Sequence, residues 1–287
     1  MSPNVNLPYF DTLLALLERD DPAVAESLGR HVHWGYWSDP GQAQKTPADY
    51  ARAAESLTRE VCKAARVGDD LAILDVGCGF GGTIASLNER FTGLHLTGLN
   101  LDDRQLERAR QQVTARETNT IRFVQGDACQ LPFEDNSCDR ILAVECIFHF
   151  PDRQRFFQEA FRVLKPGGYL TLSDFVPESW ILPMFWLGTI FPLDNWFYGS
   201  VDLTYTLADY CSLARAIGFN AIVQRDITHN TLPTYEFLFH LVRTTGHQEL
   251  SAIIQTGMMA GMSHFSLLLY MILGFEKPKP RIKPFSN

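Results

Sequence analysis

Apolar runs alternate with helix-like segments along the middle of the chain. The apolar runs predict strands, and between them apolar residues recur at helical spacing. The predicted strands are 71–76, 94–101, 121–125, 139–144, 169–173, 221–226 and 264–275. Because strands that alternate with helices in this way form parallel sheets, the pattern predicts an α/β fold. We expect a mostly parallel, doubly wound sheet of seven strands flanked by helices.

The segments between the strands give the helices. The predicted helices are 9–18, 48–66, 83–90, 102–116, 152–164, 206–217, 233–244 and 248–259. Thr206 and Asp209 have the spacing of a capping box, and Asp102 and Asp103 suit the positive end of a helix dipole. The Lys-Pro-Gly-Gly sequence at 165–168 is expected to stop one helix and turn into the next strand.

These elements predict one core with a helical cap. At 287 residues the chain can bury one sizeable core, with room for one elaboration rather than a second independent domain. We expect N-terminal helices and an aromatic cap loop in 1–66, a ligand-binding core in 67–175 and an apolar lid insertion in 176–205. The C-terminal part of the core follows in 206–287, with a helical insertion at about 233–262 before the last strand.

The first predicted strand ends in a glycine-rich turn. Asp75 precedes three alternating glycines, Gly77, Gly79 and Gly81, and a helical pattern follows them. Glycines let backbone N–H groups approach a ligand where a Cβ would collide, and the first helical turn offers unpaired donors at its positive end. The spacing Asp-x-Gly-x-Gly-x-Gly differs from the G-x-G-x-x-G of dinucleotide folds. Because a strand, a glycine turn and a helix start follow one another here, the sequence predicts a pocket of the nucleotide-binding type.

Residues 71–175 resemble the class I S-adenosylmethionine-dependent methyltransferases. The resemblance rests on the glycine turn, on Leu-Pro-Phe-Glu-Asp-Asn-Ser-Cys-Asp at 131–139 and on Arg-Val-Leu-Lys-Pro-Gly-Gly at 162–168. The similar members are natural-product sugar O-methyltransferases and tocopherol and sterol C-methyltransferases. This resemblance implies a Rossmann-like fold, S-adenosylmethionine as the cofactor and S-adenosylhomocysteine as a product.

The resemblance also implies a set of cofactor contacts. Asn100 stands where most members place an acid for the ribose hydroxyls, and an amide is the weaker acceptor. Gln105 is expected to supply a second ribose contact. Asp127 and Ala128 resemble the adenine clamp, with a plain turn cap as the alternative for Asp127. The implied cofactor-binding residues are Tyr36, Asp75, Gly77, Cys78, Gly79, Gly81, Asn100, Gln105, Asp127, Ala128 and Glu145.

An aromatic block precedes the core. Trp34, Tyr36 and Trp37 surround Gly35 in a loop that resembles the element closing over the methionine moiety in small-molecule methyltransferases. Aromatic faces stabilise cations such as a sulfonium by about 0.5–2 kcal/mol. Trp34 is therefore a candidate substrate contact and Tyr36 a candidate cofactor contact. The alternative is an aromatic loop that only packs onto the sheet.

The candidate catalytic residues follow two predicted strands. Ligands of open α/β sheets bind beyond the carboxyl ends of the strands, where Glu145, His149 and Asp174 are expected. If the acceptor is a hydroxyl, its proton must leave, and a neutral imidazole is a suitable base at pH 7. The resemblance implies His149 as this base and Asp174 as the group that orients it or the substrate. A structural role for His149 is the alternative, and Glu145 is expected to hold the backbone or the methionine amine.

The segment 176–203 is apolar and rich in aromatic residues. It is too short to span a bilayer, and Pro183, Gly188 and Pro192 interrupt it. We expect a lid over an apolar substrate, because a large apolar surface must be covered. A dimer contact or a peripheral membrane contact through 180–198 is the rival interpretation. The candidate substrate contacts here are Trp180, Phe185, Trp186 and Trp196.

The net charge and the cysteines limit which binding partners and which cellular compartment we expect. The net charge of −8 argues against nucleic acid, which requires a basic surface. The N-terminus lacks the layout of a signal peptide. Six scattered cysteines without a C-x-x-C pair indicate buried thiols in a reducing compartment, and we therefore expect a cytoplasmic location. No spacing of histidines, cysteines or carboxylates indicates a metal site.

Together the sequence predicts a methyltransferase that acts on a small, largely apolar metabolite. O-methylation in specialised metabolism is the leading interpretation. Methylation of a prenyl, sterol or quinone-like carbon, with a cation stabilised by aromatic rings, is the first alternative. A fold that only binds the cofactor, or that catalyses a cyclisation without methyl transfer, is the second.

Overall fold

The computed structural model describes residues 7–186, 197–245 and 250–280, the side chains of residues 185, 186 and 245 excepted. Seven strands form one sheet in the order β3-β2-β1-β4-β5-β7-β6. Their bounds are β1 Ala72–Val76, β2 His95–Asn100, β3 Thr120–Gln125, β4 Cys138–Val144, β5 Leu164–Pro177, β6 Asn220–Asp226 and β7 Leu268–Glu276. β7 is antiparallel to both of its neighbours, and the other strands are parallel. The prediction of a mostly parallel α/β sheet is confirmed.

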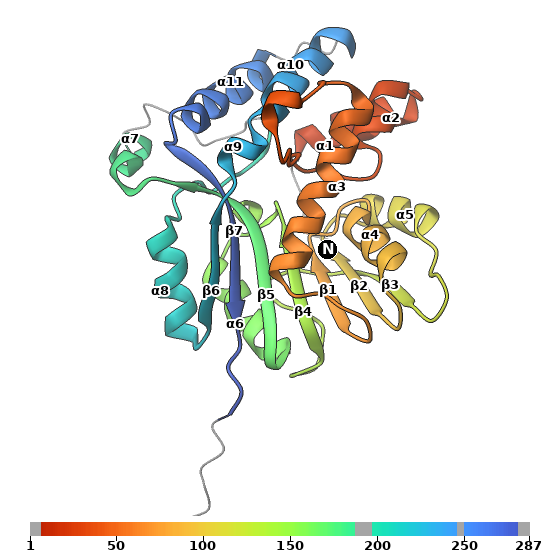
Figure 1. Cartoon of the computed structure of the whole chain (residues 1–287), viewed down its shortest axis with the longest axis vertical. Helices are drawn as coiled ribbons and strands as arrows, with labels where there is room; N and C mark the ends of the chain where they lie inside the picture. Colours follow the sequence, from red (N-terminus) through yellow and green to blue (C-terminus); the bar gives the residue numbers. More distant parts are fainter. Residues whose placement is uncertain (1–6, 187–196, 246–249, 281–287) are drawn as a thin grey trace, which may run out of the picture.

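Helices cover both faces of the sheet and one end of it. α3 (Pro47–Ala64), α4 (Gly82–Arg90) and α5 (Asp103–Gln112) pack on one face, with α6 (Arg153–Val163) and α8 (Leu207–Ile217) on the other. Further helices lie beyond the end of the sheet where β5 leads into α7, and we name the longer ones among them the cap (Figure 1). The cap helices are α1 Pro8–Glu18, α2 Pro22–Leu28, α10 Pro233–Thr245 and α11 Leu250–His264. The short helices are η1 Pro40–Gln42, η2 Ile147–His149, η3 Ser179–Ile181, α7 Leu182–Trp186 and α9 Thr228–Thr231.

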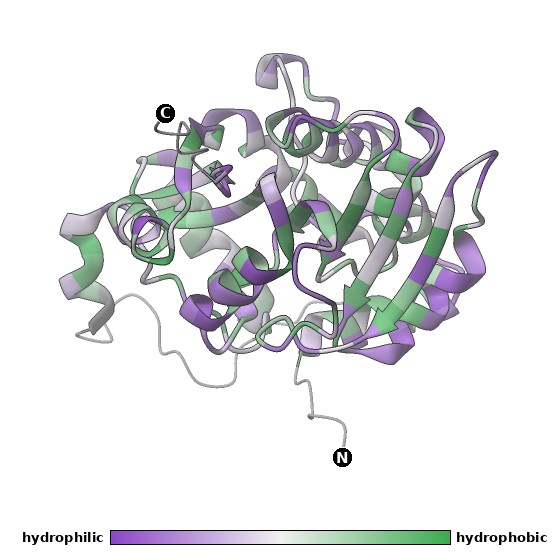
Figure 2. Ribbon diagram, turned by 90° about the horizontal axis from the view of Figure 1, so that it is seen from below, coloured by the Kyte–Doolittle hydropathy of each residue, from purple (hydrophilic) through white to green (hydrophobic). Residues whose placement is uncertain are grey.

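Alternation along the strands fills the two layers of the core. Ile73 packs with α3 and α4, whereas its neighbour Leu74 packs with α6 and α8 on the other face. Leu142 and Ala143 on β4 divide in the same way. Much of the central sheet is therefore apolar, while the surrounding helices carry long hydrophilic stretches (Figure 2). Because each strand is held in this buried sheet, the position of its end is fixed. The residues that directly follow the strand are fixed with it.

Two predicted helix starts are confirmed by their hydrogen bonds. The Thr206 hydroxyl accepts from the backbone N–H of Asp209, and the Asp209 carboxylate accepts from the backbone of Thr206, which completes the capping box of α8. Asp102 is the N-cap of α5 and accepts from the backbone N–H of Arg104 at 2.9 Å. Asp102 therefore serves the helix start, as expected.

The helix α2 is absent from the predicted elements. Asp21 caps it by accepting from two backbone N–H groups, and Pro22 occupies its first turn. The sequence Asp-Asp-Pro at 20–22 ends one helix, as expected, but it also begins another. An acid followed by proline is a helix start signal in its own right.

Two strand boundaries also differ from the prediction. β5 begins at Leu164 and not at Tyr169, because Leu164 already pairs with Cys138 of β4. α11 extends to His264, and β7 begins only at Leu268. A continuous apolar run does not distinguish the buried end of a helix from a strand, which explains the second difference.

The described part of the chain holds no helix that is long and apolar enough to cross a membrane. All six cysteines are described, and all are free thiols; five of them are buried.

The core packing predicts the cost of removing one ring. Phe157 on α6 is fully buried, and its ring lies 5.3 Å from that of Phe275 and about 6 Å from those of Tyr210 and Phe219. Phe157→Ala should lower the free energy of unfolding by about 3–5 kcal/mol, measured by urea denaturation. Phe265→Ala, at a side chain that is 74% exposed, is the control and should stay within about 0.5 kcal/mol. A Phe157→Ala loss no larger than that of the control would contradict this packing.

Candidate active site

Two cavities lie beneath the cap, at the carboxyl ends of the parallel strands. The first, of about 450 Å³, extends over the glycine turn, and we name it the loop cavity. The second, of about 280 Å³, is lined mainly by apolar side chains of the cap helices and residues 197–203, and we name it the cap cavity. Among the described residues, six belong to both walls: Tyr9, Val32, His33, Glu145, His149 and Gly199. A ligand in one cavity therefore lies next to a ligand in the other.

The glycine turn shapes the floor of the loop cavity. Gly77 has φ +69°, and a Cβ there would lie 2.7 Å from the Cβ of Cys146. Gly79 has φ +52°, but the nearest atom to a Cβ there is Oε1 of Gln105, at 3.9 Å. Gly81, at φ +79°, is the N-cap of α4. Packing thus requires Gly77, whereas a side chain at Gly79 would enter the open cavity.

Asp75 is a buried carboxyl with an unpaired oxygen. The side chain lines the loop cavity, the residue is 1% exposed, and its Oδ2 has no hydrogen-bond partner. Burial raises its pKa to about 8. An unpaired carboxyl oxygen at this depth is costly unless a ligand group satisfies it. The site is therefore suited to a ligand that carries a donor or a positive charge.

Asn100 and Gln105 form a pair at the end of β2. Nδ2 of Asn100 donates to Oε1 of Gln105 at 3.1 Å and to the carbonyl of Asp102 at 3.2 Å. Both side chains line the loop cavity. The amide hydrogens of Asn100 are thus used within the protein, and its Oδ1 remains as an acceptor.

Asp127 and Ala128 line the loop cavity beyond β3. Oδ1 of Asp127 accepts from the backbone N–H of Cys129 at 2.8 Å, as in a turn cap. This turn hydrogen bond uses only Oδ1 of Asp127. The two expected roles, turn cap and adenine contact, therefore do not exclude each other.

Glu145 joins the cap to the sheet. It has φ +52° directly after β4, and its Oε2 accepts from the backbone N–H of Trp34 at 2.8 Å and from the hydroxyl of Tyr270. Burial raises its pKa to about 8, although these hydrogen bonds oppose the rise. Glu145 lies in the wall of both cavities and holds the backbone of the aromatic loop at Trp34.

His149 lies in the same wall and is held in one tautomer. Its Nδ1 lies 3.0 Å from the carbonyl oxygen of Ser200, which can only accept, so Nδ1 carries the proton. Its Nε2 lies 3.3 Å from the Tyr9 hydroxyl and has the lone pair. Burial lowers the pKa of His149 to about 4. The ring is therefore neutral at physiological pH, with an accepting nitrogen in the shared wall.

Asp174 does not reach this wall, which corrects the expectation that it orients His149 or the substrate. Its carboxyl accepts from the Tyr210 hydroxyl and lies 3.5 Å from the Arg153 guanidinium, between β5, α6 and α8. Burial raises its pKa to about 6. Side chains alternate along a strand, so the next residue, Phe175, lines the cap cavity in its place.

The aromatic loop contributes one ring to the cavities. Trp34 lines the cap cavity and packs edge-on against Phe175 and Tyr235, with centroids 5.3 and 5.7 Å apart. Tyr36 lines neither cavity, and its ring lies 5.5 Å from the guanidinium of Arg225. The expected cofactor contact of Tyr36 is therefore corrected: this residue packs against the core, as in the alternative interpretation.

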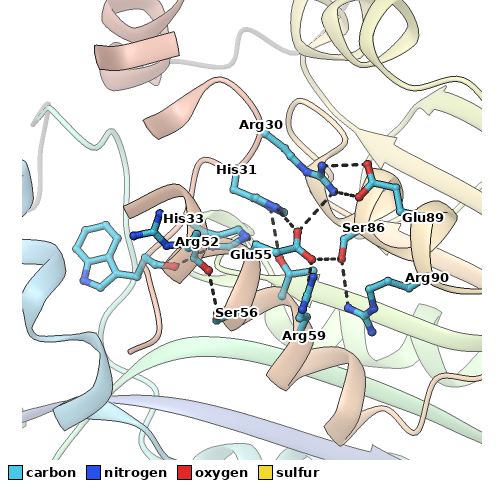
Figure 3. A network of polar contacts seen from close by, with 12 residues as sticks. Arg30, His31, His33, Arg52, Glu55, Ser56, Arg59, Ser86, Glu89 and Arg90 are labelled. Atoms are coloured by element: carbon cyan, nitrogen blue, oxygen red, sulfur yellow. Dashed lines mark hydrogen bonds and ion pairs between the residues drawn. The ribbon is translucent and has the colours of Figure 1, made fainter. Parts of the chain in front are cut away.

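A polar network fixes the residues that precede Trp34 (Figure 3). Arg30 makes a two-pronged contact with Glu89 of α4 at 3.0 and 2.9 Å, and Nε2 of His31 lies 3.0 Å from Glu55 of α3. Burial opposes ionisation of Glu55, but hydrogen bonds from His31, Ser86 and Arg59 lower its pKa to about 2. The cap loop is thus anchored to both helices beside the glycine turn.

The apolar segment reaches the cap cavity at its C-terminal end. Phe197, Tyr198, Val201 and Leu203 line that cavity. Trp180 lies in neither wall and is 64% exposed, which corrects its expected substrate contact. Trp196 and the side chains of Phe185 and Trp186 lie outside the described residues.

Some wall residues are absent from the sequence-based site. They include Tyr9, His33 and Gln255, which come from α1, the cap loop and α11. His33 stands beside the aromatic block, and that position is the one local signal. Nothing near Tyr9 or Gln255 in the sequence indicates which side of the helix faces the sheet.

The fold and this site are those of a methyltransferase, and comparison with known proteins agrees. Residues 74–172 match the family described as a methyltransferase domain. The chain is 34% identical over 214 residues, 71% of each chain, to methyltransferase GfsG of Streptomyces halstedii. It is 30% identical over 227 residues, 76% of each chain, to O-methyltransferase cnsE of Penicillium expansum. A stretch of 109 residues, 38% of this chain and 28% of the relative, is 44% identical to sterol 24-C-methyltransferase ERG6A of Gibberella zeae.

The chain belongs to the class I S-adenosylmethionine-dependent methyltransferases, and S-adenosylmethionine is its cofactor. The loop cavity fits this cofactor on two counts. The unpaired oxygen of Asp75 suits the cationic amine of its methionine part, and the open space above Gly79 leaves room for its body. The expected family, fold class and cofactor are confirmed.

The open space at Gly79 predicts how cofactor binding is lost. Wild-type protein should bind S-adenosylhomocysteine with a micromolar dissociation constant, about −8 kcal/mol, in calorimetry. Gly79→Val should abolish this heat, because the new side chain enters the cavity at a strained φ. Gly68→Val, at a glycine with no atom within 4 Å of the added Cβ, is the matched control. Wild-type affinity in Gly79→Val would show that the cofactor binds elsewhere.

Proposed function

We propose that this enzyme methylates a hydroxyl group of a small, largely apolar metabolite of specialised metabolism, with His149 as the general base. The observation that carries the proposal is the state of the His149 ring. It is neutral, and its accepting Nε2 lies in the wall between the loop cavity and the apolar cap cavity. The similarity to O-methyltransferase cnsE supports the same acceptor atom.

The residues of the shared wall would position the acceptor and remove its proton. When bound, S-adenosylmethionine supplies the methyl group and its positive charge. Most of the rate enhancement then comes from holding the acceptor oxygen in line and excluding water. The acceptor hydroxyl would replace the Tyr9 hydroxyl at Nε2 of His149, which receives the proton as oxygen bonds to carbon. A weakly basic ring suffices, because that proton becomes more acidic during the transfer.

The loop cavity would hold the cofactor through the residues that its wall brings together. Asp75 would pair with the methionine amine, and Asn100 with Gln105 would bind the ribose hydroxyls. Asp127 and Ala128 would bind the adenine. Glu145 would act by holding Trp34, and Asp174 by holding Arg153, so neither is needed for proton transfer.

The cap cavity would hold the acceptor. Its wall is built mainly of aliphatic and aromatic side chains, which suits an apolar body. Residues 197–203 close one side of it, and this supports a substrate-covering role for the C-terminal end of the segment 176–205. A dimer or peripheral membrane contact through 180–198 would instead appear as a defined dimer in solution or as co-sedimentation with liposomes.

Methylation at carbon is the second candidate, and the aromatic wall favours it. Trp34, Phe148 and Phe175 line the cap cavity and could stabilise a cationic intermediate. The similarity to sterol 24-C-methyltransferase ERG6A points the same way. Such a reaction would depend on these rings and on the carboxyl of Glu145 more than on His149.

The general-base proposal predicts a large effect of one substitution. His149→Ala should lower the turnover of an O-methylated product by about 10²–10⁴-fold, while the affinity for S-adenosylhomocysteine stays near wild type. His95→Ala, at an exposed histidine at the start of β2, is the control. The turnover measured by labelled methyl transfer should fall only as pH approaches about 4, the pKa of the His149 ring. Near-normal O-methylation by His149→Ala would remove this residue from the mechanism.

The pKa of Asp75 predicts that cofactor binding releases a proton. In the free enzyme the pKa is about 8, so the carboxyl is mostly protonated at pH 7. A cationic amine beside it favours the ionised form and lowers the pKa, and the proton is then lost to the solvent. The binding enthalpy of S-adenosylhomocysteine at pH 7 should therefore vary with the ionisation enthalpy of the buffer. Asp75→Asn should bind more weakly and lose this variation; an unchanged buffer dependence would exclude Asp75 as its source.

A further inference from the structure

Gln255 lies in the wall of the cap cavity without a partner. It stands on α11, in the cap, and is 4% exposed. Its Oε1 has no hydrogen-bond partner among the described residues. Figure 1 shows α11 in the cap, beyond the end of the sheet. Glu145 and His149 both follow β4. The cavity thus has a polar group on a second element, apart from the reacting groups.

Several other polar groups of this wall pair within the described part of the protein. Thr256, the neighbour of Gln255 on α11, shares a hydrogen bond of 2.8 Å with the Tyr198 hydroxyl. Tyr9 pairs with His149, and Glu145 pairs with Tyr270. Buried polar groups in proteins are normally satisfied, and an exception inside a ligand cavity points to the ligand. Among the described residues of this wall, the exceptions are Oε1 of Gln255 and Nε1 of Trp34. The indole nitrogen can only donate, so Gln255 is the one of the two that offers an unpaired acceptor.

We propose that Gln255 determines specificity by binding a second hydroxyl group of the acceptor. This inference rests on the proposed function, since it takes the methylated hydroxyl to lie at His149. The acceptor would then be an apolar body with two separate hydroxyls, one at each site. A hydroxyl is the group that fits, because it both donates and accepts and so satisfies either end of the amide.

Gln255 would discriminate between acceptors through the free energy lost when its amide is left unpaired. Most of the surrounding wall is apolar, so an acceptor that placed a methylene group at Gln255 would leave the buried amide unpaired. Sites built to bind a hydroxyl reject analogues that lack it more strongly than apolar pockets reject a changed methylene. Gln255 would therefore select between acceptors of the same shape.

The test compares matched diols and mono-ols. The probes are 2,6-dihydroxynaphthalene with 2-naphthol, and estradiol with 17-deoxyestradiol. Methyl transfer from labelled S-adenosylmethionine, and equilibrium binding to the complex with S-adenosylhomocysteine, are measured for each pair. Wild-type protein should prefer the diol of at least one pair by about tenfold, which corresponds to about 1.4 kcal/mol. Gln255→Met should lose this preference through a higher KM for the diol, with the affinity for S-adenosylhomocysteine unchanged.

Met259 provides the matched control. It lies one turn further along α11 and lines the same cavity, so Met259→Leu changes the wall without a polar group. Met259→Leu should keep the preference for the diol. A diol preference that is equal in wild type and Gln255→Met would overturn the proposal. Failure of the general-base assignment would appear separately, as retained O-methylation in His149→Ala.

If none of the four probes binds, the melting temperatures of the Gln255→Met and Met259→Leu variants test the proposal. If Gln255 is unpaired in the free enzyme, its replacement by methionine removes a buried polar group and should keep or raise the melting temperature. A drop of several degrees in Gln255→Met, without one in Met259→Leu, would show that the amide supports the fold, and would overturn the proposal.

Discussion

The hydrogen bond between Glu145 and the backbone of Trp34 is the contact on which the site depends. Glu145 stands at the end of β4, Trp34 in the loop that leads from the cap to α3, and Tyr270 on β7. One half-buried carboxyl therefore joins the cap to two strands of the sheet. The loop cavity and the cap cavity share a wall because the cap is held at this position.

Burial favours the uncharged form of the titratable groups in the site. It raises the pKa values of Asp75 and Glu145 to about 8 and lowers that of His149 to about 4. Near pH 7 all three groups are therefore mainly uncharged before the cofactor binds. A cationic cofactor is then the charge that the site lacks. The acids can ionise in response to it, while His149 keeps the lone pair that a proton transfer needs.

The local parts of this site could be predicted from the sequence, and the long-range parts could not. The glycine turn and the Asn100–Gln105 pair depend on neighbours within a few residues, so their spacing is sufficient to find them. For Asp174 and Tyr36, the resemblance and the place in the sequence predict a site role that the structure does not bear out. One residue of strand register turns Asp174 toward Arg153, and the loop turns Tyr36 toward Arg225. Tyr9 and Gln255 come from cap helices whose orientation depends on contacts far apart in the chain.

A crystal structure of the enzyme with S-adenosylhomocysteine tests the central claim most directly. The claim is that the methyl group passes through the shared wall, from the loop cavity to an acceptor in the cap cavity. The account predicts the adenosine beside Asp127, the amine beside Asp75, and the sulfur next to Glu145 and His149 with the cap cavity still open. A sulfur that pointed away from His149, or a cofactor that filled the cap cavity, would contradict it.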